Sequence, residues 1–258
     1  MIPTISVDYS KFRDGARALL VAKNQTVEQL VTDQGRLLTR DLLRMTPPFG
    51  GHPITESWNA QRRIGEAEVA RDVGRVFRPI STFSILAHPK NLPLAMALQR
   101  LVQSKDLAGI QTLLERLGFQ IKVVNQPDAG LHKAARRGRG RVPKSHRPVL
   151  VLDERALKRF VSQLVGDVGK TKSGWLAAAD ALGVKGVPNW IRRHAGQVQG
   201  SVRIEKQPGS FSITIGNLVG WSSDFSHLSI VQSALTHRAR AMQLQAEAIL
   251  QRAFKKVL

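Results

Sequence analysis

Residues 201–215 decide the fold class of this chain and read Ser201-Val-Arg-Ile-Glu-Lys-Gln-Pro-Gly-Ser-Phe-Ser-Ile-Thr-Ile215. Apolar and polar residues alternate on both sides of Pro208-Gly209, which is a frequent turn sequence. The stretch therefore predicts a β-hairpin. One face of this hairpin must be buried, and we expect it to pack against long helices through its alternating apolar residues: Val202, Ile204, Phe211, Ile213 and Ile215.

Two long helices are expected near the ends of the chain. In residues 10–45 apolar side chains recur at spacings of seven and four and share one helical stripe: Leu20, Val27, Val31, Leu38 and Leu42. Residues 227–257 carry a second stripe: Val231, Leu235, Met242, Ala246 and Ile249. The predicted fold class is therefore α+β, with long amphipathic helices packed on a small antiparallel β-sheet and with extended irregular segments.

We expect four parts along the chain, each marked by a change in composition or in hydrophobic periodicity. In order, they are the N-terminal long helix of the core (1–48), an extended segment with a helical hairpin insertion (49–130), a basic arm (131–148), and an α+β core with the β-hairpin and the C-terminal helix (149–258).

Shorter elements follow from local signals. Residues 49–93 are interrupted by glycine and proline, and only 60–76 have the pattern of a short helix. The remaining expected elements are helices at 94–103 and 106–117, strands at 119–124 and 149–152, a helix capped by Asp153 that runs to about 168, a helix at 173–182 and a helical turn at 188–194.

The basic arm is the strongest functional signal. Between Leu131 and Arg147 the chain has no acidic residue and seven basic ones: Lys133, Arg136, Arg137, Arg139, Arg141, Lys144 and Arg147. Such a segment is typical of binding to phosphates or to an acidic protein surface, although a solvated loop that aids solubility has the same composition. The whole chain has 39 Lys and Arg against 19 Asp and Glu, so the positive excess extends well beyond the arm.

Composition also excludes several classes of site. The chain has no cysteine, so disulfides, thiolate zinc sites and a cysteine nucleophile are excluded. No run of 18 apolar residues occurs, and the first residues lack the pattern of a signal peptide. We therefore expect a soluble protein with no membrane partner.

The most tempting catalytic motif is Gly166-Asp-Val-Gly-Lys-Thr171. A phosphate-binding P-loop would require glycine in place of Leu164 and a strand directly before the loop, whereas the preceding residues are expected to be helical. A turn between two helices explains the motif better. The seven histidines show no spacing of metal ligands. We expect no catalytic, metal-binding or cofactor-binding residues and predict that the protein is not an enzyme, although residues far apart in the sequence can still converge.

The order of several motifs resembles minor structural proteins of tailed bacteriophages, of the tail-completion or head–tail joining (neck) group. The motifs are Val7-Asp-Tyr9, Gln34-Gly-Arg-Leu-Leu-Thr-Arg-Asp-Leu-Leu-Arg-Met-Thr-Pro-Pro48, Gly65-Glu-Ala-Glu-Val-Ala-Arg-Asp-Val-Gly-Arg-Val-Phe77, Val168-Gly-Lys-Thr-Lys-Ser-Gly-Trp-Leu-Ala-Ala-Ala179 and Pro188-Asn-Trp-Ile-Arg-Arg-His194.

The resemblance implies a virion protein that assembles in the host cytoplasm as a homo-oligomeric ring at the neck. Its partners would be other neck, portal or tail proteins. The basic arm would then contact an acidic partner ring or the backbone phosphates of packaged DNA. The alternative function is a nucleic-acid-binding protein without sequence specificity that uses the same arm.

Three tryptophans are candidates for either a core or an interface. We expect Trp175 in the core, because buried tryptophans with a partner for the indole N–H are common there. Trp190 fits a core position and an interface equally well. Trp221 lies among polar, turn-forming residues and is the better interface candidate.

Overall fold

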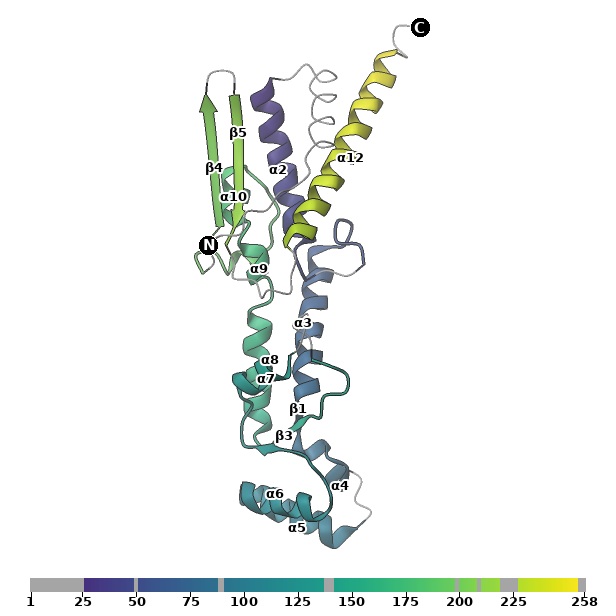
Figure 1. The fold of residues 1–258 in the computed structure, drawn as a ribbon, viewed down its shortest axis with the longest axis vertical. Coiled ribbons are helices and arrows are strands. Elements are labelled where there is room, and N and C mark those ends of the chain that lie inside the picture. Colours follow the sequence, from purple (N-terminus) through teal and green to yellow (C-terminus); the bar gives the residue numbers. More distant parts are fainter. Residues whose placement is uncertain are drawn as a thin grey trace. The chain divides into compact units, whose positions relative to one another are not determined.

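The computed structural model describes residues 26–48, 51–87, 91–136, 142–197, 200–207, 210–218 and 227–254 (Figure 1). It confirms the mixed α+β class. The chain divides into two compact units. Unit 1 comprises residues 1–64 and 168–258, and unit 2 comprises residues 65–167.

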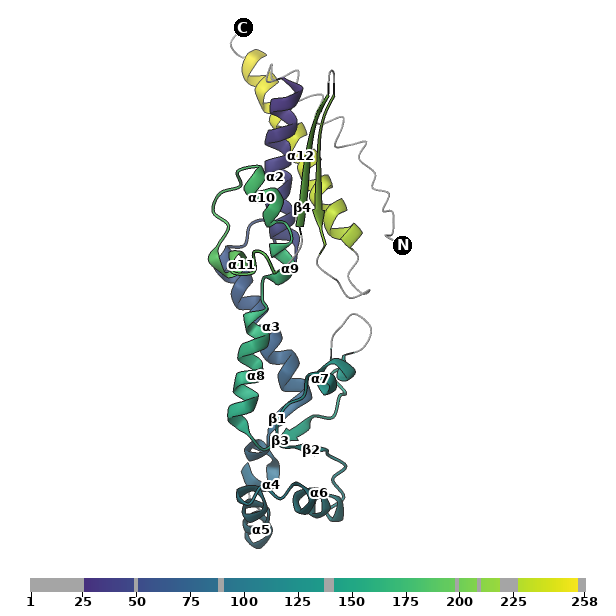
Figure 2. The same ribbon diagram turned by 90° about the vertical axis from the view of Figure 1, so that its left-hand side faces the viewer.

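Unit 1 is built around helix α2 (Val27–Met45). This helix contacts both the long C-terminal helix α12 (His227–Phe254) and strand β5 (Ser210–Asn217) of the hairpin, whose other strand is β4 (Gly200–Gln207). The short helix α10 (Leu176–Ala181) packs on β4, as Figure 1 and Figure 2 show. Helix α12 packs along α2, but the expected stripe on α2 is only partly correct: Leu42 is buried, whereas Val27 is 55% exposed and Leu30 is buried instead. Residues 10–25 of the expected first helix lie outside the described residues.

Local signals start and stop α2. Thr26 caps its first turn, because the Thr26 hydroxyl accepts a hydrogen bond from the Gln29 backbone N–H at 3.2 Å. The Gln29 side chain in turn accepts one from the Thr26 backbone N–H at 3.1 Å. At the other end Thr46 is extended, and the prolines that follow it cannot continue the helix.

The β-hairpin has the predicted pairing. Val202 lies opposite Ile215, and Ile204 lies opposite Ile213, so these side chains share one face. That face packs on α2, where a Cβ on Gly35 would lie only 3.3 Å from the Ile213 Cδ1 atom. Burial is incomplete, since 49% of Ile204 remains exposed. The turn residues Pro208 and Gly209 lie outside the described residues.

Unit 2 contains a three-stranded parallel sheet that the sequence did not predict. Its strands are β1 (Phe77–Pro79), β2 (Val123–Val124) and β3 (Val149–Val151), in the spatial order β1-β3-β2. Around the sheet lie α3 (Trp58–Val76, of which residues 65–76 belong to unit 2), the 3₁₀ helix η1 (Ile80–Thr82), α4 (Ser84–Ala87), α5 (Leu92–Gln103), α6 (Leu107–Arg116), α7 (Ala129–Ala135) and α8 (Glu154–Gly166).

The central strand β3 organises the core of unit 2. Val149 and Val151 point to one side, toward Val73, Phe77 and their neighbours, whereas Leu150 points to the other, toward a cluster between the sheet and the α5–α6 hairpin. Asp153 then caps α8, as predicted, by accepting the Ala156 N–H at 2.9 Å. This packing corrects the expectation that residues 149–258 form one core, because β3 and α8 belong to unit 2.

Several expected boundaries shift. The strand expected at 119–124 is reduced to β2, and the helix expected at 60–76 begins earlier, as α3. The helix expected at 173–182 is split into α9 (Lys170–Ser173) and α10, with Gly174 and Trp175 between them. The helical turn near 188–194 is confirmed as α11 (Asn189–Arg192), and the helical hairpin is confirmed as α5 and α6.

Gly169 lets the start of α9 lie directly against α11. Its φ is +99°, and an added Cβ would fall 2.6 Å from the Trp190 ring and 2.9 Å from the Trp190 carbonyl oxygen. Gly183 has a similar φ of +69° but nothing within 4 Å of an added Cβ. Comparing alanine substitutions at the two glycines therefore distinguishes the free-energy cost of a left-handed backbone from that of a steric clash.

We expect Gly169→Ala to lower the free energy of unfolding by about 3 kcal/mol or more, because the clash adds to the backbone strain. Gly183→Ala should cost only about 1 kcal/mol. Urea denaturation of both variants measures the difference. Equal losses would contradict the close packing of Gly169 on Trp190.

Candidate functional site

The structure places the basic arm on unit 2. Lys133 lies on α7 and is exposed, and Arg136 ends that helix. Lys144 and Arg147 are also exposed, and the Arg147 guanidinium donates a hydrogen bond to the Gln120 side-chain oxygen at 3.2 Å. Three of the seven basic residues of the arm lie outside the described residues: Arg137, Arg139 and Arg141.

Asp72, on α3, fastens both sides of the arm to the folded unit. Its Oδ2 lies 3.3 Å from Arg136 Nε, just before residues 137–141. Its Oδ1 accepts the Val142 backbone N–H at 3.2 Å, just after them. Arg75, one turn further along α3, donates to the Val142 carbonyl oxygen at 3.3 Å. Asp72 therefore holds the chain on both sides of residues 137–141, within the arm.

His132 completes this attachment from inside the core. Its Nε2 lies 3.2 Å from Asp72 Oδ2, and its ring stacks on Phe77 and meets Phe160 edge-on. Burial lowers the pKa of His132 below its ordinary value, while the Asp72 carboxylate opposes the shift. No local pattern marks this cluster, because Asp72 and its partners are 60 to 70 residues apart in the chain.

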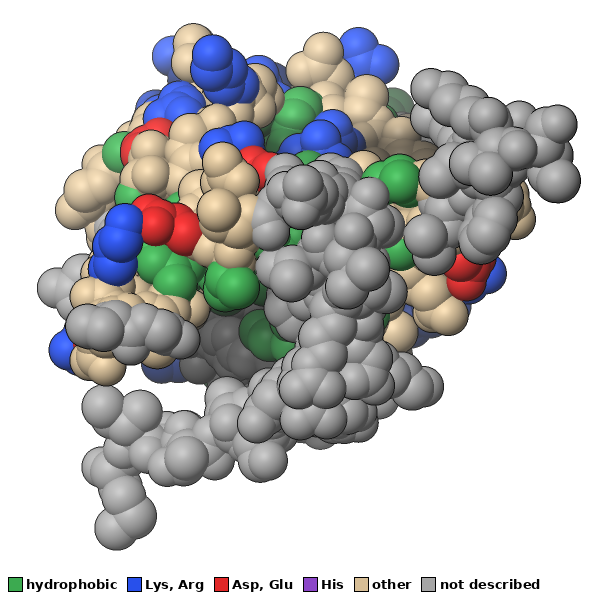
Figure 3. Space-filling view, turned by 90° about the horizontal axis from the view of Figure 1, so that it is seen from above, with side chains coloured by type: hydrophobic (Ala, Val, Ile, Leu, Met, Phe, Trp, Pro, Cys, Tyr) green, Lys and Arg blue, Asp and Glu red, His purple; other side chains and the backbone are tan. Residues whose placement is uncertain are grey.

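Two lysines of the arm present free charge. Within the part of the chain that the structure describes, neither Lys133 nor Lys144 forms an ion pair with a carboxylate. Lysine and arginine side chains are also spread over the face shown in Figure 3, so the positive charge is not confined to the arm. The arrangement can attract phosphates or carboxylates, whereas reading a base would need hydrogen-bonding groups or aromatic platforms.

The P-loop-like stretch, residues 166–171, leads from α8 of unit 2 into α9 of unit 1. It forms the predicted turn between α8 and α9, and the buried lysine just beyond it is Lys172. The Lys172 ammonium donates to the carbonyl oxygens of Leu43 at 2.8 Å and of Arg44 at 3.2 Å, and also contacts the Thr46 carbonyl oxygen. Lys172 thus caps the C-terminal end of α2, where the carbonyl groups lack partners within the helix.

Further polar contacts surround the Lys172 ammonium. The Gln61 side-chain oxygen accepts from it at 3.1 Å, and the Gln61 amide donates to the Pro53 carbonyl oxygen at 2.8 Å. The Lys172 Nζ atom lies 5.9 Å from the centre of the Trp58 ring. Burial lowers the pKa of Lys172 well below its ordinary value. The side chain is enclosed by protein groups, so it is not presented to a phosphate ligand.

Two of the three candidate tryptophans lie in the core, and the third lies outside the described residues. Trp175 lies in the core, as expected, and its indole N–H donates to the Thr46 hydroxyl at 2.8 Å. Trp190 is 5% exposed and packs against Gly169, so its side chain belongs to the core and offers little surface to a partner. Trp221 lies outside the described residues.

In the described ranges, no group of three His, Asp or Glu side chains could hold a metal ion. No helix in those ranges is both long enough and apolar enough to cross a lipid bilayer.

Comparison with known proteins found no matching family model, no similar curated protein and no similar solved structure.

We expect Lys172→Met to lower the free energy of unfolding by about 3 kcal/mol, because it leaves several buried oxygens without a donor. Lys170→Met, on the same short helix but exposed, should cost less than about 0.5 kcal/mol. Urea denaturation of the two variants provides the comparison. Similar small losses would show that the ammonium does not support α2.

The lowered pKa of His132 predicts a pH dependence of stability. Below about pH 6.5 the unfolded chain binds a proton that the folded protein binds less readily, so the free energy of unfolding falls as the pH falls toward the folded pKa. We expect a steeper loss between pH 7.5 and 5 for the wild type than for His132→Gln. Urea denaturation at several pH values tests this, and parallel curves would contradict it.

Proposed function

We propose that this protein is a structural component of a tailed-phage virion at the head–tail junction, where copies assemble as a ring that joins or completes head and tail. The observation that carries the proposal is the basic arm, which Asp72 attaches to a folded unit at Arg136 and at Val142. A fixed attachment lets each copy present the same cationic segment in the same place. Repeated around a ring, such segments would suit an acidic partner ring or packaged DNA.

The motifs that resemble neck proteins support the proposal in a second way. The end of α2, the Lys172 segment and α11 each come from one of these motifs, and in unit 1 they form one continuous set of contacts. Lys172 joins the first two, and Gly169 packs on Trp190 of the third. Three of the motifs that carry the resemblance thus contact one another in unit 1.

A nucleic-acid-binding protein without sequence specificity is the second candidate. The free charges of Lys133 and Lys144 favour it, because lysines and arginines that contact phosphates release counterions and make binding strongly salt-dependent. This candidate predicts binding by the free protein. In the ring proposal, by contrast, the arm contacts the polyanion only after the protein has assembled into a particle.

Replacing Arg136, Arg137, Arg139 and Arg141 with serine tests the role of the arm. We expect the variant gene to restore infectivity and joined particles to a gene-deleted phage at least about tenfold less well than the wild-type gene, because several phosphate or carboxylate contacts are lost. Plaque counts and electron microscopy of particles provide the readout. Unchanged infectivity would contradict the proposal.

Two further variants make this test specific. Serine at residues 137, 139 and 141 alone keeps the Arg136–Asp72 ion pair and should give a similar loss. Serine at four exposed arginines outside the arm removes the same charge and should have little effect: Arg63, Arg71, Arg78 and Arg116. Salt-sensitive binding of duplex DNA by the free wild-type protein, together with normal particles from the arm variant, would favour the second candidate.

A further inference from the structure

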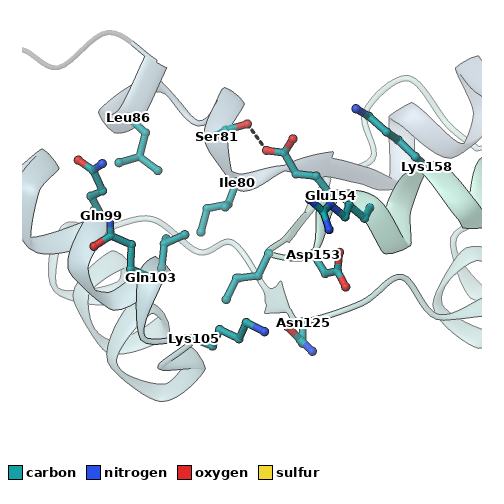
Figure 4. A pocket seen from close by; sticks show the side chains of 13 residues that line it. Ile80, Ser81, Leu86, Gln99, Gln103, Lys105, Asn125, Asp153, Glu154 and Lys158 are labelled. Carbon is teal, nitrogen blue, oxygen red and sulfur yellow. Dashed lines mark hydrogen bonds between the residues drawn. The ribbon is translucent and has the colours of Figure 1, made fainter.

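The carboxyl ends of all three parallel strands in unit 2 open into one cavity of about 850 Å³ (Figure 4). Ile80 and Ser81 follow β1, Asn125 follows β2, and Asp153 follows β3. Ligands of parallel sheets characteristically bind at this edge. The volume lies in the range of ordinary ligand sites.

The lining of the cavity combines three kinds of side chain. Apolar side chains from the strand ends and from α4 and α5 supply part of the wall: Ile80, Leu86, Val102 and Leu152. Gln99 and Gln103, one turn apart on α5, and Asn125 across from them add amide groups. Lys105, Arg155 and Lys158 add positive charge at the rim.

The two acidic groups of the cavity already have partners. Asp153 accepts the Ala156 N–H, and its Oδ2 lies 3.9 Å from Arg159. Glu154 accepts a hydrogen bond from the Ser81 hydroxyl, as Figure 4 shows. Because the Asp153 carboxylate caps the first turn of α8, that helix end does not supply the attraction for an anion.

The three basic groups are not matched in this way. Among the residues that the structure describes, neither Lys105 nor Arg155 nor Lys158 forms an ion pair with a carboxylate. Lys105 also has a φ of 56°, which is unusual for a residue other than glycine. A glycine would adopt that turn at lower cost, so what Lys105 adds there is its charged side chain.

We propose that this cavity binds an acidic peptide segment of a partner protein. The amide side chains can pair with peptide N–H and C=O groups, the apolar wall can take an apolar side chain, and the rim cations can pair with flanking carboxylates. No Phe, Trp or Tyr lines the described cavity, so a nucleobase would find no platform for stacking. The inference does not depend on the proposed role at the neck, because none of the residues that line the cavity takes part in the Asp72 attachment.

The test measures binding of a fluorescein-labelled peptide, Asp-Glu-Leu-Asp-Glu, to the full chain by fluorescence anisotropy at fixed ionic strength. We expect saturable binding that is weakened roughly tenfold by the triple variant Lys105→Gln, Arg155→Gln and Lys158→Gln. Gln103→Trp, which fills the cavity without changing its charge, should weaken binding by a similar factor. The uncharged peptide Asn-Gln-Leu-Asn-Gln should bind at least tenfold more weakly.

A matched triple variant controls for net charge. Arg78, Arg116 and Lys122 are exposed residues of unit 2 that do not line the cavity, and their replacement by glutamine should change the affinity less than twofold. Absence of saturable binding by the wild type would overturn the proposal, and so would equal losses in the two triple variants. Tighter binding of inorganic phosphate than of the acidic peptide at the same site would also overturn it, in favour of a small phosphate ligand.

Discussion

Unit 1 depends on one buried side chain, that of Lys172, whose Nζ lies at the end of α2. The last carbonyl groups of a helix have no partners within it, and here Pro47 and Pro48 prevent the helix from continuing. Lys172 binds those carbonyl oxygens and the Gln61 side chain at once. It thereby joins segments that are more than 110 residues apart in the chain. Trp175 bonds to Thr46 beside it, so the same junction also fixes the start of α10.

Unit 2 uses an acidic residue in a comparable way. Asp72 connects Arg136 and Val142 to α3, and His132 ties that carboxylate to the aromatic core. A chain with an excess of 20 positive charges has few carboxylates that can form such contacts. Because this one holds the arm at Arg136 and Val142, the arm is presented from a defined position. This attachment is what links the fold to the proposed binding of a polyanion.

Much of the fold was predictable because its signals are local. The hairpin at 201–215, the α5–α6 pair and the Asp153 cap each follow from alternation, helical spacing or a capping residue. Strands were expected near β2 and β3, but β1 has only three residues, too few to show a periodicity, and was missed. The parallel pairing of the three strands was missed because it joins segments that are far apart in the sequence. Because no sheet was expected within residues 65–167, the sequence did not indicate that this part of the chain forms a second compact unit.

The candidate site was only partly predictable. Composition located the basic arm, but nothing near Asp72 in the sequence marks it as the attachment. Lys172 resembles an exposed lysine, because its partners lie 111 to 129 residues away. The cavity of unit 2 arises only when three distant strand ends meet. Such features depend on tertiary contacts and have no local signature.

The proposed role at the head–tail junction is tested most directly by electron microscopy of lysates from a phage that lacks this gene. The account predicts DNA-filled heads that accumulate beside separate, complete tails. Normally joined particles would contradict it and would favour a nucleic-acid-binding function for the basic arm.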